Sequence, residues 1–388
     1  MPHIKVQPFD TSVLDEIIDK DDLMQFRALS SRKREELIGI RHKDASFLLA
    51  IKKKSDSYLI KPDPITRPVD NNIIKHSLVR LKDLAHLNLT YSNTAISANK
   101  PKLAHNAYKT ISSFQNLDFS DRNIEIEVGF GSGRHLLHQA KKRRGTLFIG
   151  IEIHTPSIEQ VLKQIELQGI DNIWIVNYDA RLILEMLPSN SCKGVYVHFP
   201  VPWDKKPHRR VISKSFLDES VRVLDAGGKL ELRTDSEKYY MYSLETFSQM
   251  AKINFNVQKN NDIEIRSKYE ERWMAQNKNI YTLTLLNDQI SDPKKERYEF
   301  DFGDDETLKE ISLPQKAIVR DDYFIHFEDR FDIVSGGIVQ RVSFGSFDRP
   351  EHKYLIENEN GVSYYLEKPV NTNTNYKAHK EIRGLLHG

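Results

Sequence analysis

The central part of the chain predicts an α/β fold built on a parallel sheet, and two observations support this. Short apolar runs alternate with stretches of helical spacing, a pattern typical of βαβ units. Helix boundaries are also marked, because Thr155 and Pro156 can begin a helix that Gly169 ends. The expected strands cover residues 124–130, 146–153, 172–179, 194–200 and 228–235.

The regions on either side of this zone differ from it in pattern. Residues 1–115 mix helical and strand spacing, with apolar residues at helical spacing in 10–26, and predict an α+β extension. Residues 116–288 form the predicted central domain, with 91–102 as a linker before it. Residues 289–388 carry alternating runs separated by Gly, Asn and Asp, and we expect a β-rich domain there.

Composition limits the possible classes of protein. The 388 residues are 39% hydrophobic and 29% charged, which suits a folded chain. With Lys+Arg 57 and Asp+Glu 55 the net charge is only +2, so a polyanion partner would need a local basic patch. The single cysteine, Cys192, excludes a disulfide framework. No apolar run approaches the roughly 20 residues of a membrane span, and no signal segment opens the chain, so we expect a cytoplasmic protein without a membrane partner.

A glycine-rich loop follows the first expected strand of the central domain. In EVGFGSG, residues Gly129, Gly131 and Gly133 permit a tight turn in which the backbone approaches a ligand closely. The dinucleotide pattern G-x-G-x-x-G would need glycine where Arg134 stands, which disfavours NAD. The form suits S-adenosylmethionine instead, with Glu127 as a carboxylate near the cationic ligand.

Two further carboxylates end the next two expected strands. Glu152 lies about 20 residues past the glycine loop, where a carboxylate can accept hydrogen bonds from ribose hydroxyls. Asp179 ends the third strand and could accept from an adenine amino group. Since ligands of open α/β sheets bind at the carboxyl ends of the strands, Glu127, Glu152 and Asp179 point to one cleft. The alternative is that they are helix caps or turn residues.

A basic segment follows the fourth strand. Two prolines and Trp203 predict a stiff loop, FPVPW, above the cleft. The side chains after it can hold phosphates, although a solvated surface is the alternative. This predicted RNA patch comprises Lys205, Lys206, His208, Arg209 and Arg210.

Together these motifs resemble the bacterial tRNA (guanine-N7)-methyltransferase family, in its long form with extra terminal regions. The resemblance rests on EVGFGSG, FIGIEIHTP, NYDA, FPVPWDKKPHRR, LRTDSEKY and SKYEERW, in this order over roughly 120–286. It implies a Rossmann-like class I methyltransferase sheet that transfers methyl from S-adenosylmethionine to N7 of guanine 46 in the tRNA variable loop. It also implies cofactor contacts from Glu127, Glu152 and Asp179. The implied substrate contacts are Lys205, Asp235, Ser267, Lys268, Tyr269 and Glu270.

One position departs from the family. The usual motif is FPDPW, with its Asp treated as catalytic, and here Val201 stands in that place. Guanine N7 carries an in-plane lone pair and no proton, so its attack on a sulfonium methyl needs alignment rather than a general base. We therefore assign no catalytic residue, and name Asp235 and Asp204 as candidates to stabilise the developing positive charge.

Other residues and readings carry less weight. His154 and His198 lack metal-ligand spacing, so we interpret them as supporting or core residues and expect no metal. Two alternatives to a tRNA methyltransferase stay open. One is a non-catalytic RNA-binding protein on a degenerate methyltransferase fold, which Val201 favours. The other is a methyltransferase acting on a small molecule or another RNA. Oligomeric state and the roles of the flanking regions are not assigned.

Overall fold

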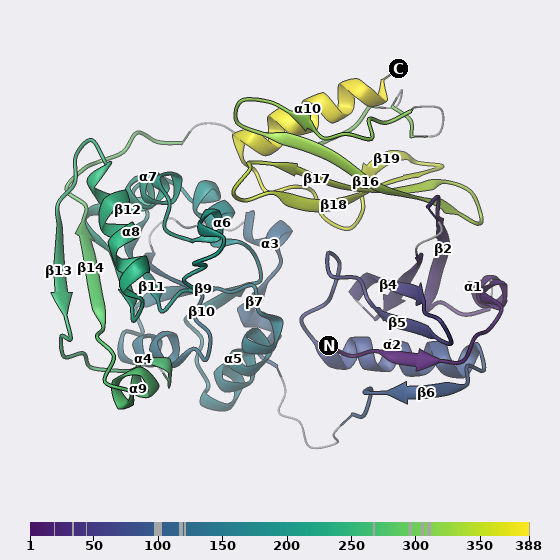
Figure 1. Ribbon diagram of the computed structural model, residues 1–388, viewed down its shortest axis with the longest axis horizontal. Helices are drawn as coiled ribbons and strands as arrows, with labels where there is room; N and C mark the ends of the chain where they lie inside the picture. The colour runs from purple at the N-terminus through teal and green to yellow at the C-terminus, as the bar shows by residue number, and fades with distance from the viewer. Residues whose placement is uncertain are drawn as a thin grey trace. The chain divides into compact units, whose positions relative to one another are not determined.

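The computed structural model divides the chain into two compact units (Figure 1). The terminal unit comprises residues 1–100, 298–369 and 373–388, and the central unit comprises 101–297 and 370–372. The structure describes residues 1–18, 20–32, 35–43, 45–96, 103–115, 119, 122–266, 268–294, 297–303, 306–308 and 312–387.

The central unit is built on a largely parallel sheet, as predicted. Its strand order is β13-β14-β12-β11-β8-β9-β10-β7. The strands from β7 to β12 along this order are parallel to their neighbours, whereas β14 runs antiparallel to both β12 and β13. The bounds are β7 Tyr108–Lys109, β8 Asn123–Val128, β9 Thr146–Ile151, β10 Ile173–Val176, β11 Cys192–His198, β12 Leu224–Thr234, β13 Phe255–Lys259 and β14 Tyr281–Leu286.

Helices cover both faces of this sheet (Figure 1). One face packs against α3, α6, α7 and α8, whose apolar residues share a core with the strands. The other face lies under α4, α5 and α9. The bounds are α3 Ile111–Gln115, α4 Arg134–Lys142, α5 Thr155–Gln168, α6 Ala180–Met186, α7 Lys214–Val223, α8 Glu237–Ser248 and α9 Lys268–Ala275.

Alternation along the central strands gives the two faces different chemistry. In β8, Ile126 is fully buried in the core under α6 to α8, while its neighbour Glu127 faces α4. In β12, Leu232 and Arg233 divide in the same way. Successive side chains of a strand point to opposite faces, so one face is apolar and the other carries buried charges.

The terminal unit joins both ends of the chain in one sheet. Its strand order is β19-β18-β17-β16-β2-β3-β4-β5-β1-β6, with β15 beside β16. The N-terminal strands are β1 Ile4–Val6, β2 Met24–Ser30, β3 Glu36–His42, β4 Ala45–Lys53, β5 Tyr58–Pro62 and β6 Leu89–Ser92. The C-terminal strands are β15 Ile318–Val319, β16 Phe324–Ile333, β17 Ile338–Gly345, β18 Glu351–Asn358 and β19 Gly361–Tyr364.

This joined sheet differs from the predicted three-part division. Strand β16 pairs antiparallel with β2, Phe331 opposite Ser30. Arg341 donates to Glu35 at 2.5 Å, and the Tyr354 hydroxyl donates to Asp63 at 2.9 Å. The regions 1–115 and 289–388 were expected to be separate, but these contacts make most of them one unit.

Three local differences from the sequence expectations have clear causes. The helical spacing in 10–26 yields only a 3-10 turn, Thr11–Leu14, and the one-turn helix α1, Asp15–Ile18. The Asp21 carboxylate then accepts from the Leu23 amide and turns the chain into β2. The C-terminal region also contains the helices' counterpart α10, Asn373–Leu386, beside its strands. Of the expected linker, Tyr91 and Ser92 belong to β6, and 97–102 lie outside the described residues.

The remaining N-terminal helix, α2, spans Asn71–Leu84 and packs under β1, β4 and β5. No helix in the described part of the chain is both long enough and apolar enough to cross a bilayer.

Candidate functional site

The order of the central sheet reverses between β8 and β11, and this topological switch point marks the candidate site. Strands β9 and β10 lie on one side of it, and β11 and β12 on the other. Ligands of open α/β sheets bind outside the carboxyl ends of the strands at such a point. The glycine loop, Glu152, Asp179, the loop after β11 and Asp235 each follow the carboxyl end of a strand. Topology therefore brings the predicted segments to one edge of the sheet.

The glycine loop has the backbone conformation that its sequence predicts. Gly129, Gly131 and Gly133 have φ values of +68°, +51° and +69°, in the left-handed region that favours glycine. A Cβ added at Gly133 would lie 2.5 Å from a methyl group of Val161 in α5. A Cβ at Gly129 would meet nothing within 4 Å. The loop is therefore tightly packed where it enters α4 and open where the chain leaves β8.

Glu152 ties the loops after β8 and β9 together. Its Oε2 accepts from the Gly131 amide at 3.0 Å, and its Oε1 accepts from the amides of Ile153 and His154 at 2.8 and 2.9 Å. The carboxylate is therefore held at the rim of the switch point. Beside it, Ile153 is 72% exposed, an apolar side chain at the site that sequence reasoning missed.

Asp179 is the N-cap of α6, the alternative reading that the sequence allowed. Its Oδ1 accepts from the Arg181 amide at 2.9 Å, and its Oδ2 accepts from the Arg181 guanidinium at 2.6 Å. An adenine contact would share these oxygens with Arg181, and it stays a prediction.

Glu127 faces the charged side of the sheet, under α4. His135 Nδ1 lies 2.8 Å from the Glu127 carboxylate, and both side chains are largely buried. Burial lowers the pKa of His135, but the charge of Glu127 and their hydrogen bond outweigh it, so the pKa is raised overall. The protein therefore already provides Glu127 with a partner that favours the protonated form.

A second carboxylate–histidine pair lies next to the first. His198 Nε2 is 3.0 Å from the Glu231 carboxylate, which also accepts from Lys229 at 2.9 Å. Burial lowers the pKa of His198. Burial also raises the pKa of Glu231, but its bonds to His198 and Lys229 prevail and lower it overall. The buried charges are thus arranged in adjacent pairs.

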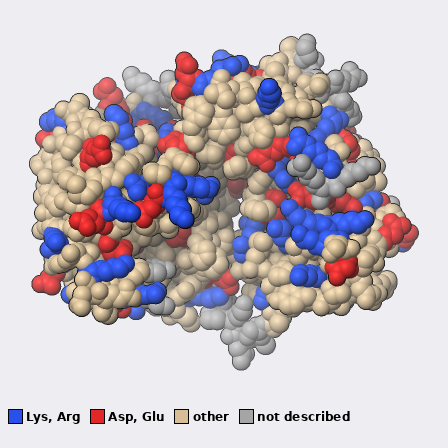
Figure 2. Space-filling model, viewed as in Figure 1, with Lys and Arg blue, Asp and Glu red and all other residues tan. Residues whose placement is uncertain are grey.

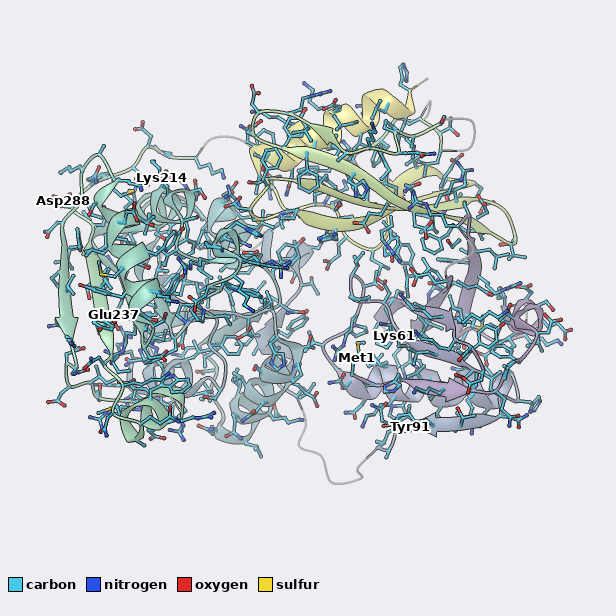
Figure 3. All side chains as sticks on the ribbon, viewed as in Figure 1. Met1, Lys61, Tyr91, Lys214, Glu237 and Asp288 are labelled. Atoms are coloured by element: carbon cyan, nitrogen blue, oxygen red, sulfur yellow. The ribbon has the colours of Figure 1, made fainter. Side chains whose placement is uncertain are left out.

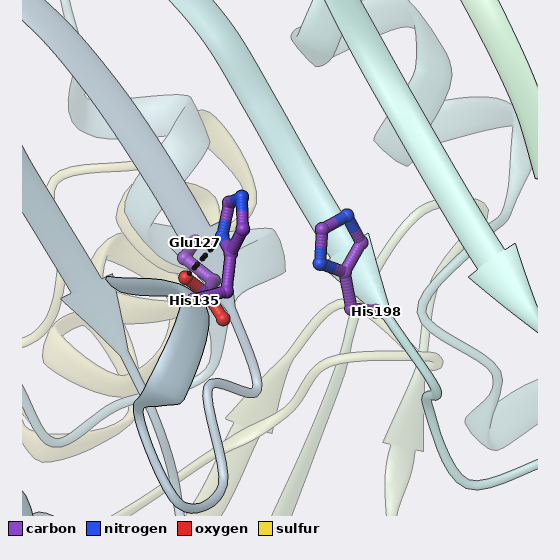
Figure 4. A group of neighbouring side chains, drawn as sticks. All are labelled: Glu127, His135 and His198. Atoms are coloured by element: carbon purple, nitrogen blue, oxygen red, sulfur yellow. Dashed lines mark hydrogen bonds and ion pairs between the residues drawn. The ribbon is translucent and has the colours of Figure 1, made fainter. Parts of the chain in front are cut away.

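These two pairs create the one cluster of potential metal ligands found among the described residues. Glu127, His135 and His198 offer ligand atoms within 4.8 Å of one another (Figure 4). The sequence concealed this set because the residues come from β8, α4 and β11. Hydrogen bonds to Glu127 and Glu231 already account for both imidazoles, and the expected absence of a metal stays a prediction. Alternating Glu and Ile in β8 was the available signal for buried charge on this face.

The loop after β11 is strained and is held from below by Arg210. Phe199 and Trp203 have φ values of +53° and +46°, which non-glycine residues seldom adopt. Arg210 is only 7% exposed, donates to the Pro202 carbonyl at 2.8 Å and lies 4.4 Å from the ring centre of Tyr242. The expectation that Arg210 belongs to the RNA patch therefore needs correction, because its guanidinium is used inside the protein.

The rest of the predicted RNA patch lies on the surface. Lys205, Lys206, His208 and Arg209 are exposed. The Arg209 guanidinium lies 5.1 Å from the ring centre of Trp203, which is 36% exposed. Removing Arg210 leaves a smaller patch that follows the strained loop.

The candidate acidic residues near Val201 are partly neutralised. Val201 itself is 61% exposed. Asp235 accepts from Lys278 at 2.9 Å, and an Asp204 oxygen lies 3.6 Å from the Arg210 guanidinium. Each candidate carboxylate thus has a cationic neighbour, and the catalytic role stays unassigned.

The predicted substrate segment 267–270 is anchored from beneath. Glu270 is 2% exposed and accepts from Arg233 at 2.7 Å, and Arg233 also donates to the Thr282 hydroxyl at 3.1 Å. The Glu270 side chain therefore points into the protein and secures α9. Ser267 lies outside the described residues, as do the side chains of Lys268 and Tyr269.

Comparisons with known proteins agree with this geometry. Residues 121–283 match the family described as "Putative methyltransferase". The chain is 40% identical over 356 residues to a tRNA (guanine-N(7)-)-methyltransferase of Wolinella succinogenes, covering 91% of each protein. It is 37% identical over 378 residues to the protein of that name from Campylobacter jejuni strain 81-176, covering 95% of this chain and 94% of the relative. A relative of the same name from Helicobacter hepaticus is 38% identical over 91% of each chain.

Proposed function

This chain belongs to the tRNA (guanine-N(7)-)-methyltransferase family, and on that premise we propose that it methylates N7 of guanine 46 in the tRNA variable loop. Membership makes it an S-adenosylmethionine-dependent methyltransferase. The observation that carries the proposal is the similarity over 91% of the chain, which includes the glycine loop and the basic loop after β11. The expected place of action is the cytoplasm, where tRNA is the partner.

The residues at the switch point suit the methyl donor. The open backbone at Gly129 and Gly131 leaves room for the methionine part to approach the loop. Glu152 would add the ribose hydroxyls to its amide contacts, and the exposed Ile153 would pack against the adenine ring. Asp179 would accept from the adenine amino group beside Arg181. These assignments use the donor's ribose, its base and its amino-acid part.

Glu127 has a different part in this proposal. To meet the donor's ammonium group it would exchange its hydrogen bond to His135 for one to the ligand. Because that bond favours protonated His135, donor binding at Glu127 would be coupled to the charge of this histidine.

Transfer to N7 requires positioning more than proton transfer. When bound, S-adenosylmethionine supplies a methyl group on a sulfonium sulfur. The strained loop carrying Val201 and Trp203 would place the purine, and Lys205 would donate to guanine O6 next to N7. Asp235 and Asp204 lie on the same edge of the sheet, where a carboxylate stabilises the positive charge that develops on the base. Lys206, His208 and Arg209 would contact phosphates.

The deciding experiment is nucleoside mass spectrometry of tRNA incubated with the protein and isotope-labelled donor. We expect labelled 7-methylguanosine from a tRNA with guanine 46, and none from a transcript in which that guanine is adenine. Label on a different base or atom would contradict the proposal.

Val201 keeps one other candidate in view, a non-catalytic RNA-binding protein. Calorimetry with S-adenosylmethionine separates the two functions. Saturable binding at micromolar donor supports the enzyme, whereas RNA binding without any donor binding at high micromolar concentration supports the scaffold.

A further inference from the structure

The terminal unit has a sheet region rich in lysine and free of acidic residues. Strands β1, β4, β5 and β6 contain Lys5, Lys52, Lys53 and Lys61, and neither Asp nor Glu occurs in them. Lys and Arg side chains gather where β4 and β5 lie in the space-filling view (Figure 2). The proposed function does not use this region.

Strand register places three of these lysines on one face. Lys5 pairs with Leu59, Leu59 pairs with Lys52, and Lys61 follows two residues after Leu59 in β5. The intervening residues, such as Ile4 and Ile60, are buried in the core with α2 on the other face. We call Lys5, Lys52 and Lys61, together with His3 and Tyr91, the lysine face.

An exposed aromatic pair forms the edge of the lysine face. Tyr91 is 49% exposed and pairs with Lys5 across β1 and β6. The His3 ring stacks on Tyr91 with centroids 5.2 Å apart and planes 28° apart. The Lys5 ammonium lies 6.0 Å from the Tyr91 ring centre. All four residues of β6 are exposed, so a flat ligand can reach this ring. Tyr91 and Lys61 are both labelled in Figure 3.

The charge of the lysine face is not cancelled locally. Lys52 pairs with Glu35, but Glu35 also accepts from Arg341, so that group of three keeps one positive charge. Among the described residues, no carboxylate lies within ion-pair distance of Lys5 or Lys61. The face therefore combines uncompensated cations with an accessible aromatic ring, the arrangement that proteins use to bind single-stranded nucleic acid.

We propose that the lysine face is a second RNA-binding surface, which holds unpaired nucleotides of the tRNA substrate. A base stacks on Tyr91 at the open edge, and Lys5 and Lys61 contact the neighbouring phosphates. The inference rests on the proposed function, since it assigns the bound polyanion to the same RNA. It gives the terminal unit a part in substrate affinity and none in the methyl-transfer step.

The charge contribution is tested with Lys5→Glu/Lys61→Glu in the full-length chain. Its matched control is Lys20→Glu/Lys316→Glu, which makes the same change in net charge at exposed lysines outside the face. Fluorescence anisotropy with labelled tRNA at several salt concentrations gives the Kd and its salt slope. We expect at least tenfold weaker binding for the first variant and a salt slope smaller by about 2, one per lost phosphate contact. Donor affinity and kcat should match the wild type.

The stacking contribution is tested with Tyr91→Ala and Tyr91→Phe. Loss of the ring should weaken tRNA binding by about fivefold or more without changing the salt slope, because stacking releases no counterions. Phenylalanine keeps the ring and should restore the wild-type Kd. Thermal unfolding of each variant checks that the unit remains folded.

The proposal is overturned if Lys5→Glu/Lys61→Glu binds tRNA like the wild type, or if the control variant loses as much affinity. It is also overturned if Tyr91→Phe loses as much affinity as Tyr91→Ala. A wild-type protein that binds tRNA through this face without methylating it would contradict the proposed function alone, so the two failures are distinguishable.

Discussion

The two faces of the central sheet are held to their helices by different forces. Under α6, α7 and α8, side chains such as Val197 and Leu232 are fully buried among apolar residues. On the opposite face, carboxylates of the same strands are paired with cations. The four pairs are Glu125 with Arg143, Glu127 with His135, Glu231 with Lys229, and Glu270 with Arg233.

The difference separates stability from position. Apolar burial is non-directional and stabilises the fold roughly in proportion to area. A buried ion pair gains little net stability because desolvation opposes it, but its hydrogen bonds require one geometry. The paired face lies under α4, which follows the glycine loop, and under α9, which carries the predicted substrate segment. We infer that the charged face sets where the site's segments lie.

The largest expected effect comes from breaking the most buried pair. Arg233→Ala leaves Glu270 charged and unpaired, and should lower the free energy of unfolding of the central unit by about 3–5 kcal/mol. Replacing both residues by methionine should cost less than this, because no unpaired charge remains. Chemical denaturation followed by circular dichroism measures both variants. A double variant less stable than Arg233→Ala would contradict the account.

The neighbouring residue of β12 tests the opposite face. Leu232→Ala removes fully buried apolar volume and should lower the free energy of unfolding by about 2–5 kcal/mol. Unlike Arg233→Ala, it should leave the KM for tRNA unchanged, because α9 keeps its ion pair. Denaturation and steady-state kinetics at a temperature where both variants are folded make the comparison. Equal changes in KM for the two variants would remove the distinction between the faces.

The edge where the faces meet is tested through Glu152. Glu152→Ala removes the ribose acceptor and frees the Gly131 amide, and should weaken donor binding by about 1.5–3 kcal/mol. Calorimetry with S-adenosylmethionine measures the loss. Glu166→Ala, at an exposed position of α5, is the control and should bind donor normally. Unchanged affinity in Glu152→Ala would refute the ribose assignment.

The smallest expected effect is the pH dependence of the His135 pair. Because the folded pKa of His135 lies above its ordinary value, the pair stabilises the protein most below about pH 6.5, and this contribution falls as pH rises through the folded pKa. His135→Gln should therefore reduce the loss of stability above pH 6.5, by about 1 kcal/mol or less.

The comparison of His135→Gln with wild type isolates this titration, since other nearby charges are common to both. His135 faces Glu127 and is also influenced by Glu231 and Arg143, while His198 packs beside it. The lowered pKa of His198 acts in the opposite sense, because stability falls as pH drops below about 6.5. Melting temperatures from pH 5 to 9 measure the difference. Parallel curves for both proteins would show that His135 does not titrate there.

What the sequence alone determined is local in origin. Alternating strand and helix spacing predicts the parallel strands, which the structure confirms from β8 to β12. The glycine loop was also readable, since Gly129, Gly131 and Gly133 adopt the left-handed backbone that their residue type permits. The resemblance to the family rests on short runs of neighbouring residues and is confirmed by relatives that span nearly the whole chain.

Only the tertiary structure decided which charged residues reach solvent and which partner each one takes. Arg210 and Glu270 look like surface residues in sequence, but one supports the strained loop and the other is buried against Arg233, 37 residues away. The joining of β2 to β16 brings Ser30 and Asp329 into contact across 299 residues. The physical reason is that burial and ion pairing depend on strand order and helix packing, which place residues together regardless of their separation along the chain.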